Sequence, residues 1–189
     1  MTSSRARLLA AGLGAFSANG FAAASVADVC ATAGVAKPTL YHFFGSKEGL
    51  FAAVVSEHGA GPSDRVAQAS RYDGDVTTTL RRLAGTYLDV GRTDQDLYRL
   101  LLLTRLGPPT AAVRPALDVL DRWNSAAVSL FSAAARDHGN MRGRESRYAA
   151  SFRGLVDAYV GLCWSGEVDP TDPLLVPELV HQFMHGIFS

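Results

Sequence analysis

Residues 37–47 carry a group of side chains whose chemistry suits contact with nucleic acid. A hydroxyl, a phenol and an imidazole follow one another at Thr39, Tyr41 and His42, and a lysine stands at each end of the segment. Hydroxyl, imidazole and ammonium groups donate hydrogen bonds to base edges and to phosphate oxygens. We therefore expect this segment to face DNA; the alternative is an ordinary solvated helix surface.

Two short helices joined by a tight turn would position these side chains. Ser25 with Asp28 three residues later is typical of a helix start. The serine hydroxyl accepts a hydrogen bond from a free amide of the first turn, and the helix dipole stabilises the negative charge of the aspartate. Gly34 ends that helix, and a second begins at Pro38, whose missing N–H costs nothing in a first turn. This pattern predicts a helix-turn-helix, whose second helix enters the major groove.

Helical periodicity assigns the two sides of that second helix. The large apolar side chains Leu40, Phe43 and Phe44 fall on one side and are expected to face the core. The other side is expected to face out, and Thr39 and His42 near the helix start are expected to reach base edges. Phosphate oxygens are expected to be bound by Lys37, Tyr41 and Lys47, and by the helix amino ends that Ser25 and Ser46 cap.

Composition places the chain among globular proteins without a membrane span. Of its 189 residues, 48% are hydrophobic, which argues against disorder, and no run reaches the ~18–20 apolar residues that a span needs. We read no signal peptide at the N-terminus, and the two cysteines, Cys30 and Cys163, lack the spacing of metal ligands. Formal net charge is zero, yet residues 1–50 hold four basic and two acidic residues. A cytoplasmic location is expected.

The remaining pattern is helical, with no strand alternation and no internal repeat. A first helix is expected over 3–18, ended by Asn19-Gly20, and a fourth runs from Ser46 towards His58 with a break or kink at 59–62. Longer helices are expected over about 75–91, 95–106, 110–138, 145–165 and 174–188. The fold class is therefore all-α with about nine helices. We expect a DNA-binding domain over 1–47 and a larger effector-binding and dimerisation domain over 48–189.

The segment around the two short helices resembles the DNA-binding domain of the TetR family of bacterial regulators, over about residues 5–55. The matching positions are Gly20-Phe21, Ser25, Ala33-Gly34-Val35-Ala36, Leu40-Tyr41, Phe43-Phe44, Ser46-Lys47 and Leu50. The resemblance implies DNA contacts at Ser25, Lys37, Pro38, Thr39, Tyr41, His42 and Lys47. Two positions depart from the family pattern: Ala36 stands where a capping serine is common, and Phe43 where a polar histidine or tyrosine is common.

For the C-terminal part the resemblance implies a ligand cavity among the middle helices and a dimer interface on the last two. Aromatic and polar residues at apolar positions are the cavity candidates, although each also suits core, rim or surface: Tyr87, Tyr98, Arg105, Trp123, Asn124, Phe131 and Trp164. Arg105 suits an anionic ligand, or an ion pair with a nearby aspartate. The expected interface residues, whose alternative is their own core, are Phe152, Leu155, Val156, Tyr159, Leu175, Leu179, Phe183 and Ile187.

No motif predicts catalysis, so we expect neither an enzyme nor a cofactor. Glu178, His181 and His185 share one helix face, but a metal site would need a further ligand and a polar rim is the simpler interpretation. The expected function is that of a homodimeric transcriptional repressor. A small apolar or aromatic effector is expected to release it from a near-palindromic operator. A helical enzyme and an architectural DNA-binding protein are the alternatives. A repressor and an activator would both use the same DNA-binding domain, which is called the head below.

Overall fold

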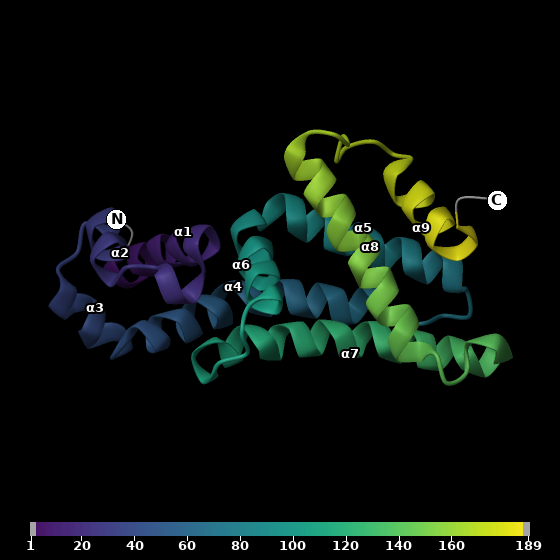
Figure 1. Cartoon of the computed structure of the whole chain (residues 1–189), viewed down its shortest axis with the longest axis horizontal. Helices are drawn as coiled ribbons and strands as arrows, with labels where there is room; N and C mark the ends of the chain where they lie inside the picture. The colour runs from purple at the N-terminus through teal and green to yellow at the C-terminus, as the bar shows by residue number, and fades with distance from the viewer. Residues whose placement is uncertain (1–2, 187–189) are drawn as a thin grey trace. The chain divides into compact units, whose positions relative to one another are not determined.

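A computed structural model of the chain describes residues 3–186 and is all-helical over that range, with no strand (Figure 1). In chain order the α-helices are α1 Ser4–Ala23, α2 Val26–Ala33, α3 Lys37–Phe44, α4 Lys47–Ala69, α5 Val76–Thr93, α6 Gln95–Leu106, α7 Arg114–Asp137, α8 Glu145–Ser165 and α9 Leu175–His185. Short 3-10 helices span Ala111–Val113 and Gly139–Met141. The predicted all-α class is confirmed.

Two helices run further than the sequence pattern indicated. In α1 the expected end at Gly20 is a kink, because Gly20 has φ 71° and the helix continues to Ala23. In α4 the helix continues through Pro62 to Ala69 instead of breaking at 59–62. Proline removes one backbone hydrogen bond, but the buried valines on either side of it, Val54, Val55 and Val66, keep the same helix packed on both halves.

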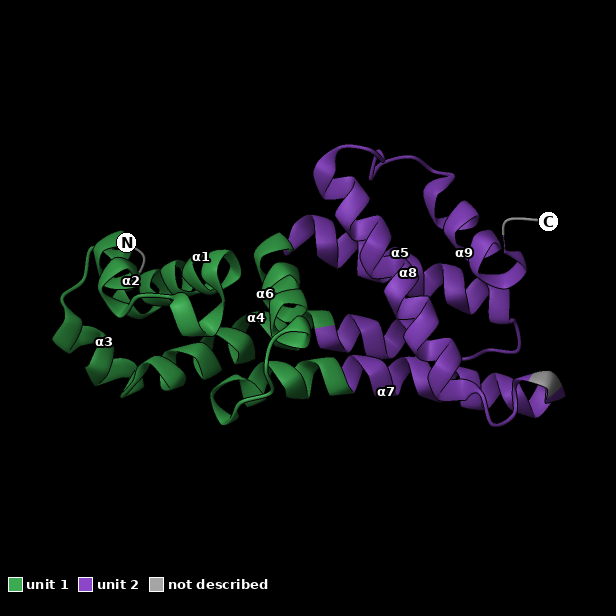
Figure 2. Ribbon diagram, in the orientation of Figure 1, with its two compact units in different colours: residues 1–62, 95–121 green, residues 63–94, 122–189 purple. Residues whose placement is uncertain are grey.

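Two compact units divide the chain (Figure 2). Unit 1 holds the residues up to Pro62 together with Gln95–Asp121, and unit 2 holds Ser63–Asp94 together with the residues from Arg122 onwards. Helices α4 and α7 each contribute residues to both units. These units describe packing and not function, so the boundary expected between residues 47 and 48 stays a proposal.

Unit 1 is built on α1, which packs against α2, α3 and α6. Its core holds a cluster of three phenylalanines: the ring centroids of Phe16 and Phe51 are 5.0 Å apart, and those of Phe21 and Phe51 are 5.2 Å apart, both edge to face. A Cβ at Gly12 would lie 3.2 Å from a Val54 methyl, so α1 and α4 approach closely there. This packing holds α1 in place, and the short helices α2 and α3 pack against α1.

Unit 2 packs α5 against α8 and α9 around a core of large aromatic side chains. Tyr87 and Trp123 are buried, their ring centroids are 5.4 Å apart, and the Tyr87 hydroxyl donates to the Trp123 carbonyl at 3.3 Å. The buried guanidinium of Arg153 lies 5.5 Å from the centroid of each of these two rings. A Cβ at Gly91 would lie 2.8 Å from a Val160 methyl, so a glycine is needed where α5 meets α8.

The burial of Tyr87 predicts a loss of stability at alkaline pH. Burial raises the pKa of Tyr87 from 10.0 to about 12. The charge of Arg153 lowers this pKa and that of Asp157 raises it, both by smaller amounts. The folded state therefore holds the phenol proton more tightly than the unfolded state. The stability that this group contributes to the folded state is fully present below about pH 10 and is lost as the pH rises towards 12. The free energy of unfolding should fall by up to roughly 3 kcal/mol over that interval through this group alone. Denaturant unfolding at three alkaline pH values would measure the fall.

A Tyr87→Phe variant is the control, because it keeps the ring and lacks the titrating hydroxyl. Its free energy of unfolding should fall less steeply than that of the natural protein between pH 10 and 12. Equal slopes for the two proteins would show that Tyr87 does not carry the effect.

Candidate nucleic-acid interface and effector cavity

Helices α2 and α3 and the turn between them have helix-turn-helix geometry. The Ser25 Oγ accepts a hydrogen bond from the Asp28 amide at 3.3 Å and so caps α2, as the sequence predicted. Gly34 has φ 61° in the left-handed region, which glycine adopts without strain, and it ends α2. Helix α3 starts at Lys37 with Pro38 in its first turn and receives no side-chain cap from Ala36. In this first turn Pro38 has no amide proton, and the Thr39 amide donates to the Ala36 carbonyl at 3.0 Å.

Helix α3 buries one residue and exposes most of the others. Leu40 is fully buried, whereas Tyr41 is 48% exposed. Lys37, Pro38 and His42 are also exposed, and Thr39 is half-buried. The expectation that Phe43 faces the core is wrong, since it is 43% exposed and its ring lies beside those of His42 and Phe44 on the same helix. In a helix of eight residues only Leu40 and Phe44, four positions apart, share the inward face.

Lys47 lies in a different environment from the other predicted DNA contacts. Its ammonium donates a hydrogen bond to the Ala22 carbonyl at 3.0 Å and lies 4.8 Å from the centroid of the Phe21 ring. These contacts join the first turn of α4 to the end of α1. Lys37, by contrast, is exposed and makes no ion pair with any residue of the described range. A phosphate contact for Lys47 stays a prediction, beside a structural role within the head.

Replacing Lys47 by methionine separates the two roles. The lost hydrogen bond and cation–π contact should lower the free energy of unfolding by about 1 kcal/mol, because the site is partly exposed. If the role is structural, the slope of log affinity against log salt on DNA stays unchanged. The matched control, Lys37→Met, should leave stability within ~0.5 kcal/mol and flatten that slope by ~0.9 per lost phosphate contact. A flattened slope for Lys47→Met with unchanged stability would assign Lys47 to phosphate instead.

A side-chain hydrogen bond joins α1 to α6 within unit 1. The buried Ser17 hydroxyl lies 2.9 Å from the Asp96 carboxylate and 3.0 Å from the Gly14 carbonyl of its own helix. Asp96 stands in the first turn of α6. Through this hydrogen bond, a movement of α6 would act directly on α1.

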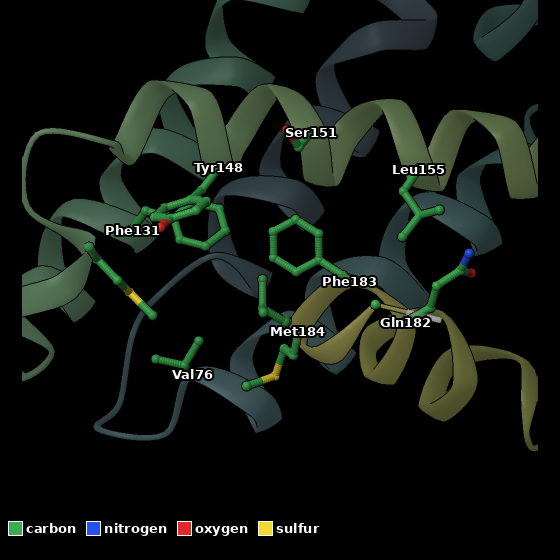
Figure 3. Close-up of a pocket in the computed structure, with 11 residues that line it drawn as sticks. Val76, Phe131, Tyr148, Ser151, Leu155, Gln182, Phe183 and Met184 are labelled. Carbon is green, nitrogen blue, oxygen red and sulfur yellow. The ribbon is translucent and has the colours of Figure 1, made fainter. Parts of the chain in front are cut away.

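A cavity of about 620 Å³ lies in unit 2 (Figure 3). Its walls come from α5, α8 and α9, from Phe131 of α7 and from the short helix that follows α7. Figure 3 shows Phe183 of α9 pointing towards α8, opposite Ser151 and Leu155. The lining consists of Val76, Leu80, Phe131, Met141, Tyr148, Ser151, Leu155, Gln182, Phe183, Met184 and Gly186.

Of the residues that the sequence suggested for an effector cavity, Phe131 lines this one. Tyr87, Tyr98 and Trp123 are buried in the cores of their units. Arg105 and Asn124 are exposed, and Trp164 is half-buried with its indole N–H donating to the Gly91 carbonyl at 2.9 Å. The other lining residues were not predicted for a cavity: Leu155 and Phe183 were expected at a dimer interface, and helical periodicity gives no sign of a void.

The residues proposed for a dimer interface divide into two groups. Phe152, Val156, Leu175 and Leu179 are buried within unit 2, which is the alternative that the sequence left open. Leu155, Tyr159 and Phe183 are half-buried and retain exposed surface, whereas Ile187 lies outside the described residues. An interface on α8 and α9 therefore has to use the second group together with the exposed residues between them.

Two further features concern metals and membranes. The rings of His181 and His185 lie 4.8 Å apart, but between residues 3 and 186 no three His, Cys, Asp or Glu side chains are grouped to hold a metal ion. Over the same part of the chain, no helix combines the length and apolar character that crossing a bilayer requires.

Sequence comparison identifies the head. Residues 8–54 match the family model described as bacterial regulatory proteins, tetR family. Over 97 residues the chain is 35% identical to the HTH-type transcriptional activator FasR of Mycolicibacterium smegmatis. That match covers 51% of this chain and 44% of FasR, so it spans less than half the length of that relative.

Solved structures share the fold over nearly the whole chain. A TetR-like transcriptional regulator from Rhodococcus sp. RHA1 has a TM-score of 0.74 at 23% identity, covering 95% of this chain and 93% of that one. FadR from Bacillus subtilis, solved in complex with stearoyl-CoA, has a TM-score of 0.76 at 16% identity, covering 96% and 98%. These similar proteins are transcriptional regulators and not enzymes. Residues 8–54 therefore match the tetR family of bacterial regulatory proteins in sequence, and the chain as a whole shares its helical fold with the solved regulators.

Proposed function

We propose that the protein is a dimeric transcriptional regulator that binds a near-palindromic operator through α3 and loses affinity for it when a small apolar effector binds. The observation that carries this proposal is the outward face of α3, where Lys37, Tyr41 and His42 are exposed on a helix that only Leu40 anchors. Such a helix fits the major groove, with Thr39 and His42 towards base edges and Tyr41 towards phosphate.

Dimer formation is proposed through α8 and α9. The exposed side of α8 carries small residues at Gly154, Ala158 and Gly161, which allow close approach of a second helix, beside the half-buried Leu155 and Tyr159. Two helices from each copy would form an isologous four-helix contact. A dimer places two copies of α3 about 34–36 Å apart, one turn of DNA, which is what a near-palindrome requires.

The effector is proposed to be an acyl compound. Support comes from the apolar cavity of unit 2 and from the fold shared with FadR of Bacillus subtilis, whose structure holds stearoyl-CoA. A release of the operator would make the protein a repressor acting on DNA in the bacterial cytoplasm. An activator is the second candidate, because the relative FasR is named as one.

Titration of decanoyl-CoA into a complex of the protein with its operator duplex tests this function. We expect two protomers per operator by analytical ultracentrifugation, and a fall of about 100-fold in operator affinity at saturation, a coupling within the usual range. Transcription from a template carrying the operator separates the candidates, since a repressor lowers and an activator raises it before the effector is added. A monomer on DNA, or an affinity that no acyl compound changes, would contradict the proposal.

A further inference from the structure

We propose that Phe43 of α3 contacts the 5-methyl group of a thymine in the major groove and so determines part of the operator sequence. This inference rests on the proposed function, because it names a base that the same helix would recognise. It starts from an apolar ring on a helix that otherwise offers DNA mostly polar groups. Phe43 is 43% exposed, although phenylalanine is among the residues most often buried.

Helix α3 carries its outward side chains in rows, since residues four apart lie one above the other on the same side of a helix. One row holds Lys37 and Tyr41, the row on the opposite flank holds Thr39 and Phe43, and His42 lies between them. The first row presents an ammonium and a phenol, which suit phosphate. The second presents a hydroxyl, a methyl and a phenyl ring, so this flank of the helix is the apolar one.

The Phe43 ring lies next to a side chain that is expected to face the bases. Its centroid is 5.5 Å from that of His42, with the ring planes at 63°, and 6.1 Å from that of Phe44. Phe44 shares the inward side of α3 with the fully buried Leu40 and so supports one edge of the Phe43 ring. Because helical side chains lean towards the amino end, the ring covers the surface beside Thr39, which is also expected to reach a base edge.

Thymine is the base whose edge complements a phenyl ring. The major groove presents hydrogen-bond donors, hydrogen-bond acceptors and one apolar substituent, the thymine 5-methyl group. A phenyl ring placed against the polar edges would remove their water without replacing the lost hydrogen bonds, which is unfavourable. Placed against the methyl group, the ring buries apolar surface on both partners. The chemistry of Phe43 therefore favours a T·A pair at one position of each half-site.

The contact would form twice in each complex, because a dimer presents two copies of α3 to a near-palindrome. Burying one methyl group contributes roughly fourfold to an affinity, so the loss of both contacts should weaken operator binding about 15-fold. Phe43 carries no charge and releases no counterion from DNA. The slope of log affinity against log salt should therefore stay unchanged when the contact is lost, unlike the slope for a phosphate contact of Lys37.

The test uses the full-length protein and the duplex that selection from randomised DNA enriches. Each thymine of that duplex is replaced in turn by deoxyuridine at the symmetric positions of both half-sites, which removes the methyl group alone. We expect one such pair of replacements to weaken binding of the natural protein about 15-fold, measured by fluorescence anisotropy at fixed salt. Phe43→Ala should weaken binding to the thymine duplex by a similar factor. On the deoxyuridine duplex the two proteins should bind within about twofold of each other, the non-additivity expected of a direct contact.

Two variants serve as controls. Phe43→Leu keeps an apolar side chain and should retain most of the preference for thymine over deoxyuridine. Leu106→Ala removes a side chain that is 82% exposed at the end of α6, outside α3, and should change neither the affinity nor the preference. Thermal unfolding of Phe43→Ala should have a midpoint within a few degrees of that of the natural protein, because the ring is exposed on a surface helix.

Two results would overturn the inference and leave the proposed function standing. Equal affinities of the natural protein for the thymine and deoxyuridine duplexes at every position would show that no methyl group is contacted. An equal response of the natural protein and Phe43→Ala to the loss of the methyl group would assign that methyl to another side chain. Failure of the natural protein to enrich any duplex would instead refute the proposed function, and the thymine contact with it.

Discussion

Replacing Tyr41 by phenylalanine is expected to weaken operator binding at least about 100-fold, because each dimer loses two hydroxyl donors to phosphate and each bond to a charged group contributes roughly 1.5–3 kcal/mol. The Tyr41 side chain is 48% exposed and makes no hydrogen bond or ring contact within residues 3–186. Its hydroxyl is therefore available to DNA and is not needed for folding. A fluorescence anisotropy titration at fixed salt measures the loss.

The matched control is Tyr72→Phe, which removes a hydroxyl that donates to Asp137 at 2.9 Å within unit 2. This variant should bind the operator as the natural protein does. For Tyr41→Phe, the free energy of unfolding should change by less than ~0.5 kcal/mol. Unchanged operator affinity in the Tyr41 variant would remove this side chain from the interface and shift the contact to Lys37 and His42.

Replacing Ser17 by alanine is expected to uncouple the effector from the head. The variant lacks the hydroxyl that joins α1 to Asp96 of α6, while Asp96 is exposed and remains solvated. Operator affinity without effector should be close to that of the natural protein, and the effector-induced fall should drop from about 100-fold to less than about tenfold. Operator titrations with and without saturating decanoyl-CoA give the ratio.

Ser70→Ala is the control for this change. Ser70, the residue after α4, is also buried, but its hydroxyl donates to the Ala67 carbonyl of that adjoining helix at 2.9 Å. Both variants should lose about 1 kcal/mol of stability from a deleted hydrogen bond. Only Ser17→Ala should lose the effector response; an equal loss in both would trace the effect to general destabilisation.

Local sequence signals predicted the elements that depend on local chemistry. The bounds of α6 and α8 agree with the periodic runs over 95–106 and 145–165, and Ser25 and Gly34 cap and end α2 as expected. These features are set within a few residues by capping and by glycine conformation. They need no knowledge of what packs against the helix.

Features that depend on long-range packing were not predictable in this way. The breaker signal at Pro62 was overridden by burial along α4, and Phe43 lies exposed because α3 offers the core one short face. Phe152 and Leu179 look like interface residues in sequence, yet α5, α8 and α9 already bury them. The cavity is a void between helices, and of its lining residues the sequence suggested Phe131 alone for an effector site.

The most direct test of the central claim is selection of bound sequences from randomised duplex DNA with the purified protein at fixed salt. The account predicts enrichment of one near-palindrome whose half-sites lie about 34–36 Å apart along the helix. Recovery of no sequence above background would contradict specific regulation and would favour an architectural protein that binds DNA through its charge alone.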